Sequence, residues 1–564
     1  MTRPAWRAVI PAPLRVTPGA GAFRFGPGTT VGYRDPALGP VVERACRDLA
    51  RRTGIRVEPA PAACDDPAAD EPAVRLELGG HPDLDPLPAA SGISPVGGAV
   101  PDERHALTIE ADRITLRGGQ VVGVARGLTT LVQMLATAAP GTDGAAVLPG
   151  CRILDAPRFA WRGLTLDVAR AWFSVAELKR VIDLLALYKV NVLHLHLTDD
   201  QAWRIEAGRP ADRREPDGTF YTDAELRDLV AHADERFVTL VPEADAPGHT
   251  AALLLLHPEL DSGRNVRQVA VAPGSPIPWR SVWLDPDLPA TFQVMDQVLA
   301  EIAGIFPGRY LHLGADEPFG MPEHLYARYL RRAREHARSL GRHTVAFQES
   351  VRAITEPDHV IQYWIGDTDP EPLPGLDQDA GQDAGQDAGQ DAAGAVPDDL
   401  EAASARNTAQ SRRDVETALR WSVPVLVTPR RHAYCDVPYA EPSADPAQEP
   451  LRQRLGLRHY PPQTVAETFD WEPAAALGGD AGTGHVVGVG AAMWCETVDG
   501  FDDLTFLLMP RLAGNAEKGW GAAGSTTWSG HRAALAVHGR LWAQDGVTCF
   551  RSSGVDWAPD RAPA

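Results

Sequence analysis

Two adjacent carboxylic acids, Asp316 and Glu317, come directly after a short apolar stretch that starts at Tyr310. That stretch is too short for a helix and is typical of a buried strand. Acids at the end of a buried strand are unfavourable unless they have a function, and in a parallel α/β barrel this end carries the active site. The pair could equally cap a following helix, because Pro318 suits a first helical turn. Taken alone, the pair leaves both interpretations open.

Because Asp316 and Glu317 are adjacent in sequence, only some reactions suit this pair of acids. Side by side at one strand end, the two carboxyl groups point in different directions. Most glycosidases need two carboxyls on opposite sides of the anomeric carbon, which this spacing does not suit. It does suit substrate-assisted hydrolysis, in which the 2-acetamido oxygen of the sugar is the nucleophile. One acid then protonates the leaving oxygen, and the other steadies the acetamido N–H.

Strand and helix patterns alternate along the chain from Trp161 onward. Two capping boxes, Ser174 with Glu177 and Thr222 with Glu225, mark the starts of helices. Eight candidate strands can be counted, which is the number in a TIM barrel. They are residues 163–170, 191–197, 237–241, 310–313, 344–347, 360–364, 423–427 and 486–493.

Most of these strands end in a charged, polar or aromatic residue. A single capping acid is common, whereas a ring of sugar-contacting side chains at strand ends is not. The ring therefore favours an active site over simple helix capping. Its members are Arg170, Asp199, Glu243, Asp316, Phe347, Trp364 and Trp494.

The pattern predicts a (β/α)8 barrel preceded by a small α+β domain. Residues 1–155 are expected to form the N-terminal domain, with a hairpin at residues 105–117 and a helix at residues 127–135. Residues 156–530 are the predicted catalytic barrel. A Gln-Asp-Ala-Gly repeat at residues 375–399 is read as a low-complexity insertion, and residues 531–564 as a C-terminal helical tail.

Composition limits the class of protein. The 564-residue chain carries a formal net charge of −21, which argues against a nucleic acid or an anionic membrane as partner. The six cysteines are dispersed without the spacing of a zinc site. No apolar leader and no membrane-spanning run is recognisable, so the sequence predicts a cytoplasmic protein. A secreted protein whose leader had been removed would look the same.

Several motifs in one order resemble glycoside hydrolase family 20, the β-N-acetylhexosaminidases. Residues 312–317 are similar to the family signature His-x-Gly-(Gly/Ala)-Asp-Glu. The resemblance covers residues 161 to about 520 and implies exo-acting hydrolysis of terminal β-linked GlcNAc or GalNAc with retention, through an oxazolinium intermediate. It implies no cofactor and no metal. The other matching segments are residues 162–170, 193–204, 242–249, 434–436 and 493–496.

The resemblance assigns catalytic roles to three residues. Glu317 would be the general acid and then the base, with its pKa raised by its surroundings. Asp316 would stay ionised and accept a hydrogen bond from the acetamido N–H. Tyr434 would donate its hydroxyl to the acetamido carbonyl oxygen.

The resemblance also implies a set of substrate-binding residues around these three. Three charged side chains would hold the sugar hydroxyls, two residues would form a supporting pair, and two indoles would wall the site. The residues for the hydroxyls are Arg170, Asp436 and Glu496. The supporting pair is Asp199 and His249, and the two indoles are those of Trp364 and Trp494.

One position departs from the family pattern. Phe347 stands on the fifth strand where the family usually has Trp. Phenylalanine keeps an apolar wall but loses area and the indole N–H, so we expect a looser pocket and weaker substrate binding.

Two other functions stay open at this point. A sugar-binding homologue without turnover draws its only support from Phe347. A metal-dependent barrel hydrolase would use His194 and His196, which are two residues apart on one strand and face the same side. Buried, hydrogen-bonded histidines are the favoured interpretation of that pair. The preferred sugar, the natural aglycone and the oligomeric state do not follow from the sequence.

Overall fold

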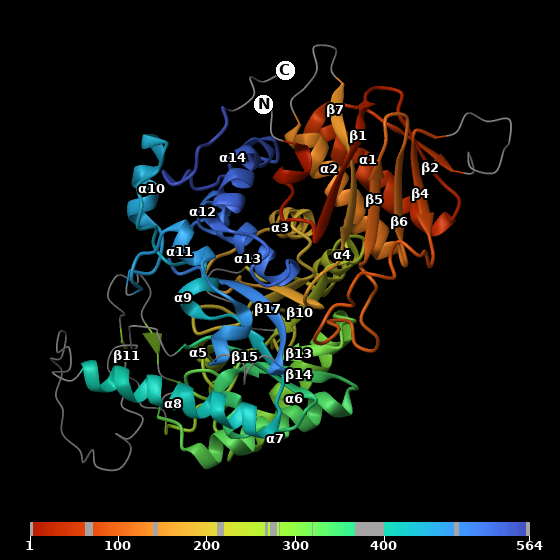
Figure 1. The fold of residues 1–564 in the computed structure, drawn as a ribbon. Coiled ribbons are helices and arrows are strands. Elements are labelled where there is room, and N and C mark those ends of the chain that lie inside the picture. Colours follow the sequence, from red (N-terminus) through yellow and green to blue (C-terminus); the bar gives the residue numbers. More distant parts are fainter. Residues whose placement is uncertain are drawn as a thin grey trace.

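The computed structural model describes residues 4–61, 72–138, 145–210, 219–264, 269–270, 279–280, 282–318, 320–366, 400–458, 460–478 and 484–559. The predicted insertion at residues 375–399 lies outside these ranges. Within them, no helix is long and apolar enough to cross a membrane. Figure 1 shows an N-terminal sheet domain, coloured red to orange, beside a barrel formed by the rest of the chain.

The N-terminal domain is a seven-stranded mixed sheet with its apolar core packed against two helices, α1 (Gly39–Thr53) and α2 (Val121–Thr137). The predicted hairpin is present, with its two strands antiparallel from His105 opposite Gly118 to Ile109 opposite Ile114. In sheet order the strands are β1 (Arg15–Phe25), β7 (Ala146–Asp155), β5 (His105–Ile109), β6 (Ile114–Gly118), β4 (Val74–Leu78), β2 (Thr30–Tyr33) and β3 (Glu58–Pro61).

Eight parallel strands close into a barrel, in which the first strand pairs with the last. The predicted fold class is therefore confirmed, and the eight predicted strands are the barrel strands, with small differences at their ends. They are β8 (Trp161–Asp167), β9 (Val192–His196), β10 (Thr239–Glu243), β13 (Tyr310–His312), β14 (His343–Phe347), β15 (His359–Tyr363), β16 (Val425–Val427) and β17 (Val486–Met493). The predicted domain limits at residues 155 and 530 stay predictions.

Both predicted capping boxes start helices. Ser174 and Thr222 accept hydrogen bonds from the third residue of the helix, whose glutamate accepts one in return. The helices are α3 (Val175–Leu187), α4 (Asp223–Asp234), α5 (Ala251–Leu256), α6 (Pro289–Ile305), α7 (Glu323–Ser339), α8 (Leu400–Trp421), α9 (Arg430–Ala433), α10 (Glu449–Arg454), α11 (Val465–Phe469), α12 (Phe501–Leu508), α13 (Arg511–Trp520) and α14 (Trp528–Gln544).

Buried ion pairs join the two domains. Asp155, at the end of β7, accepts hydrogen bonds from Lys189 Nζ at 2.8 Å and from Trp520 Nε1 at 2.9 Å. Glu103 accepts from Arg162 at the start of the barrel and from Arg126 on α2. Because these charges are almost fully enclosed, each depends on its partner, and the domains are held in one arrangement.

Candidate active site

The loop after β13 presents the two adjacent acids in an unusual backbone conformation. Gly314, Ala315 and Glu317 have φ angles of +69°, +79° and +48°. A Cβ on Gly314 would lie 1.6 Å from Asp245 Oδ1, so only glycine fits there. The loop is held by Ala315 N, which donates to Asp245 Oδ1, and by the Tyr326 hydroxyl, which donates to the Ala315 carbonyl. Such strain is typical of functional sites.

This loop conformation excludes one interpretation of the acids. Pro318 suits a first helical turn, which left helix capping open as one interpretation, but α7 starts only at Glu323. The acids therefore do not cap a helix. They lie at the carboxyl end of the barrel strands, where parallel barrels carry their active sites.

A cavity at this end of the barrel gathers nine of the eleven predicted site residues. The two exceptions, Phe347 and Asp436, are buried close by. The cavity is lined by Arg170, His196, Asp199, His249, Asp316, Glu317, Trp364, Tyr434, Tyr460, Trp494 and Glu496.

A chain of alternating charges supports one side of the cavity. Arg170 Nη2 lies 2.6 Å from Asp199 Oδ2, and His196 Nε2 lies 2.8 Å from the same oxygen. The other ring nitrogen of His196 lies 2.8 Å from Glu243 Oε2. Burial acts to lower the pKa of His196, but its two carboxylate neighbours raise it well above its usual range. A histidine bonded to a carboxylate at both nitrogens is held as imidazolium.

His249 connects this chain to the two acids. Its Nδ1 lies 3.4 Å from Asp199 Oδ1, while its Nε2 lies 3.5 Å from Glu317 Oε2 and 3.8 Å from Asp316 Oδ2. Burial opposes protonation, yet Asp199 and Asp316 raise the pKa of His249 well above its usual range. The predicted pair of Asp199 and His249 is therefore in contact, with a positive charge beside both acids.

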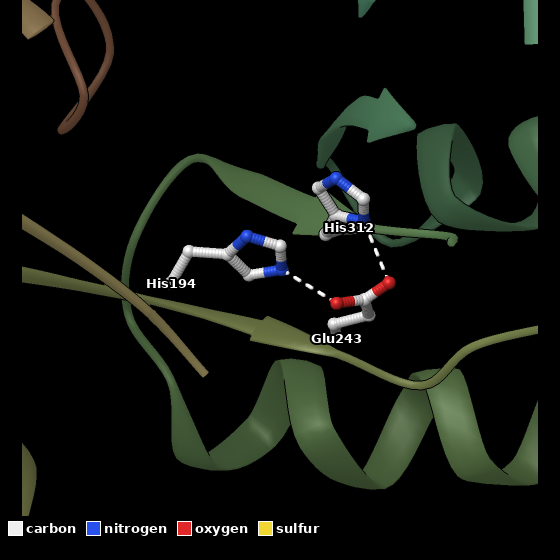
Figure 2. A group of neighbouring side chains, drawn as sticks. All are labelled: His194, Glu243 and His312. Atoms are coloured by element: carbon white, nitrogen blue, oxygen red, sulfur yellow. Dashed lines mark ion pairs between the residues drawn. The ribbon is translucent and has the colours of Figure 1, made fainter. Parts of the chain in front are cut away.

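A layer of histidines lies beneath the cavity around Glu243. His194 Nε2 lies 2.8 Å from Glu243 Oε2, and His312 Nδ1 lies 3.2 Å from Oε1 (Figure 2). The two rings stack at 4.1 Å. These side chains are close enough to ligate one cation. However, His194 Nδ1 already lies 2.9 Å from Thr165 Oγ1, and each ring nitrogen of His196 lies 2.8 Å from a carboxylate oxygen. The contacts agree with the favoured interpretation of His194 and His196 as buried, hydrogen-bonded residues.

Burial is the main influence on the two acids themselves. It raises the pKa of Glu317, and the hydrogen bond and charge of His249 act in the opposite direction. Burial also raises the pKa of Asp316. The charge of His249 lowers this pKa, whereas the charge of Glu243 raises it further. Within the described residues, the buried Asp316 Oδ1 has no hydrogen-bond donor. A ligand N–H would satisfy that atom and favour the ionised form of Asp316.

Two further acids, Asp436 and Glu496, follow β16 and β17, and β17 pairs with the strand that Arg170 follows. Burial raises the pKa of Glu496 to about 7, and burial with the charge of Glu496 raises that of Asp436 well above its usual range. Arg511 fixes this segment by donating to the Cys435 carbonyl at 2.8 Å. Glu496 Oε2 is buried and accepts no hydrogen bond from a described residue, so it is available to a ligand hydroxyl.

The aromatic side of the site differs from expectation at Phe347. This side chain is only 1% exposed and does not line the cavity. Its ring packs edge-on against His312 at 4.7 Å and lies 6.1 Å from Trp494. Trp364 and Trp494 face the cavity, and Phe347 supports them from behind.

Comparison with known families agrees with this geometry. Two family models match the chain, "Glycosyl hydrolase family 20, domain 2" over residues 7–156 and "Glycosyl hydrolase family 20, catalytic domain" over residues 159–321 and 395–523. The chain belongs to glycosyl hydrolase family 20. The resemblance drawn from the motifs is thereby confirmed.

Individual relatives of family 20 match both domains. A β-N-acetylhexosaminidase of Cellulomonas fimi is 33% identical over 87% of this chain and 88% of its own. A β-hexosaminidase mutant of Streptomyces plicatus, solved with its product GlcNAc, has a TM-score of 0.77 and 28% identity, covering 99% of this chain and 98% of its own. The family 20 β-N-acetylhexosaminidase of Streptomyces coelicolor A3(2) has a TM-score of 0.76 and 29% identity, covering 99% of each chain.

Sequence reasoning assigned no role to three residues of this family 20 site. Tyr460 lines the cavity from an irregular segment between α10 and α11, where no periodicity marks it. Asp245 holds the acid loop, and its place just after β10 was the available signal. Glu349, two residues after Phe347, accepts a hydrogen bond from Trp364 Nε1 at 3.2 Å. Burial and the charge of Asp316 raise the pKa of Glu349 to about 8.

Proposed function

We propose that this protein is an exo-acting β-N-acetylhexosaminidase that releases terminal non-reducing GlcNAc or GalNAc with retention of configuration. The observation that carries the proposal is the buried Asp316 Oδ1, which accepts from no described residue and belongs to the acid next to Glu317, whose pKa is raised by burial. A substrate-assisted mechanism needs both groups side by side: a carboxylate oxygen that can accept the acetamido N–H, and a carboxyl group that is protonated and can act as the acid. The relatives named for this activity support the same conclusion.

Glu317 is the general acid in this mechanism. Because burial keeps its carboxyl protonated to higher pH, it can donate a proton to the leaving glycosidic oxygen. The acetamido oxygen of the substrate attacks the anomeric carbon, and an oxazolinium ion forms. Glu317, now ionised, then takes a proton from the water that opens this ring. His249, 3.5 Å away, stabilises that ionised form.

Asp316 orients the internal nucleophile. Its Oδ1, which no described residue contacts as a donor, accepts the acetamido N–H, and its negative charge stabilises the positive charge that develops on the oxazolinium ring. Tyr434 is buried in the wall of the same cavity and donates its hydroxyl to the acetamido oxygen. The two contacts hold the acetamido group in position for attack.

The remaining cavity residues hold the sugar. Arg170, Asp436 and Glu496 bind its hydroxyls, where charged groups make strong hydrogen bonds. Trp364 and Trp494 cover its apolar face and the acetamido methyl group. Because the acids, the hydroxyl-binding residues and the indoles all surround one terminal sugar, this lining fits an exo-acting enzyme.

Release of p-nitrophenol from the β-glycosides of GlcNAc, GalNAc and glucose tests the proposal. We expect turnover of the two acetamido sugars only. Equal turnover of the glucoside would refute substrate assistance. Binding of GlcNAc without any turnover would indicate the sugar-binding homologue, and loss of activity in a chelator would indicate a metal-dependent hydrolase.

The roles of Glu317 and Asp316 can be distinguished by comparing substrates with different leaving groups. In Glu317→Gln, a 2,4-dinitrophenyl glycoside should retain far more activity than the p-nitrophenyl one, because its leaving group needs less protonation. In Asp316→Asn, both substrates should lose activity by a similar factor of about 100 or more. Glu235→Gln, an exposed acid far from the cavity, is the matched control and should behave as the parent protein.

A further inference from the structure

Four arginines converge on a small cavity between the two domains. Arg44 and Arg52 come from α1, Arg126 from α2, and Arg236 from the segment after α4. Figure 1 shows α3 and α4 beside the N-terminal domain. Since α3 and α4 run towards the starts of β9 and β10, the cavity lies at the end of the barrel opposite to the active site.

The acids at this cavity are already shared between cations. Three of the four arginines reach a carboxylate that a second arginine or a histidine also contacts. Glu103 is shared by Arg126 and Arg162, Asp183 by Arg236 and His232, and both Asp48 and Asp545 by Arg51 and Arg52. Arg236 has a second partner in Glu235, whose side chain is 65% exposed.

Arg44 is the arginine of this cavity that forms no ion pair with a described residue. Within the described part of the chain, no carboxylate lies within 4.0 Å of its guanidinium, which sits over the ring of Phe237 at 5.9 Å. Burial and the neighbouring Arg236 lower the pKa of Arg44 to about 10, although the charges of Asp48 and Glu235 act in the opposite direction, so Arg44 stays charged at neutral pH. A partly buried, unpaired cation facing other cations is unfavourable unless an anion joins it.

The lining of the cavity indicates the class of anion. Its four guanidinium groups offer several N–H donors, from which the oxygens of one tetrahedral oxyanion can accept hydrogen bonds. Guanidinium groups also match phosphate and sulfate oxygens in geometry.

We propose that the interdomain arginine cluster, formed by Arg44, Arg52, Arg126 and Arg236, binds a free tetrahedral oxyanion of the phosphate type. The anion supplies the negative charge that Arg44 lacks. Because the arginines come from both domains, the bound anion fastens the N-terminal domain to the barrel. The site is separate from the sugar cavity and does not depend on the activity proposed for it.

Thermal unfolding in phosphate tests the site. At constant ionic strength set with sodium chloride, the unfolding midpoint of the full chain should rise saturably with inorganic phosphate, by about 3 °C near saturation. Isothermal titration should give one phosphate per chain. A midpoint that follows only ionic strength, or titration without a binding signal, would overturn the proposal.

Variants on one helix give the matched comparison. Arg44→Gln should lose the saturable response, and without phosphate it should unfold at or above the temperature of the parent, because an unpaired charge has gone. A purely structural role for Arg44 on Phe237 requires the opposite, a lower midpoint. Arg47→Gln, on the exposed side of the same helix, should keep the full phosphate response. An equal response of Arg44→Gln and the parent would refute the assignment.

Two further arms complete the experiment. Arg44→Lys keeps the charge and should retain a weaker phosphate response, which keeps the test valid if Arg44→Gln folds poorly. Glucose 6-phosphate should give a weaker response than inorganic phosphate, because one oxygen of its phosphate group is esterified and cannot accept from an arginine in the same way. A response equal to that of inorganic phosphate would overturn the assignment to a free oxyanion.

Discussion

Replacing His249 by glutamine should move the alkaline limb of the pH–rate profile to higher pH. His249 Nε2 lies 3.5 Å from Glu317 Oε2, and both groups are enclosed. At an effective dielectric constant of 20, opposite charges about 4 Å apart attract by about 4 kcal/mol. Glutamine removes this attraction, so the pKa of Glu317 rises and its protonated, active form persists to higher pH.

The attraction between His249 and Glu317 need not reach about 4 kcal/mol for the pKa shift to be measurable. About 1.4 kcal/mol, a third of the full value, moves a titration by one pH unit. We therefore expect the alkaline limb of kcat for the p-nitrophenyl GlcNAc substrate to move up by at least about one pH unit, while kcat at its optimum falls because Asp199 loses its contact with the ring.

A matched histidine controls for general effects of the substitution. His257 lies just beyond α5 and contacts the Gly208 carbonyl at 2.7 Å, outside the cavity. His257→Gln should leave both limbs in place. An alkaline limb that stays fixed in His249→Gln, or moves to lower pH, would refute the conclusion that a positive charge on His249 acts on Glu317.

Three other substitutions test the packing of the site and of the domain interface. Gly314→Ala should lower kcat/KM by more than about 100-fold, because its Cβ would overlap Asp245; near-parent activity would show that the acid loop can move. Phe347→Trp should change KM and lower stability by about 1–3 kcal/mol, since the ring is already enclosed; unchanged kinetics and an unchanged unfolding midpoint would contradict this. Asp155→Asn should lower the free energy of unfolding by about 3–5 kcal/mol, because Lys189 is left buried without its anion. Denaturant unfolding checks the last prediction, and Asp155→Asn combined with Lys189→Met should recover part of the loss.

The local elements of the barrel could be predicted because their signals are local. Ser174 with Glu177 and Thr222 with Glu225 formed the capping boxes that their spacing indicates. The eight strands followed from short apolar runs. Nine site residues meet in one cavity because parallel strands in a barrel deliver their carboxyl ends to the same place.

The path of the chain after β13 could not be predicted in the same way. Pro318 is a good first helical residue, yet Ala315 and Glu317 adopt positive φ angles and α7 begins later. Contacts with Asp245 and Tyr326 hold that conformation, and both lie outside the local sequence. Tertiary contacts can override local preference when they satisfy several polar groups at once.

The sequence by itself determined the order of the strands, the acids at their ends and the family to which they belong, because each is encoded in short motifs. Only the tertiary structure decided the charge of each group. His196 is held as imidazolium by Glu243 and Asp199, whereas burial and the nearby His312 lower the pKa of His194, two residues earlier, to about 4. Among the described residues, Arg44 likewise has no carboxylate within 4.0 Å of its guanidinium, and Arg236 from the barrel domain acts to lower its pKa. Charge state depends on neighbours and burial, and both are set by the folded chain.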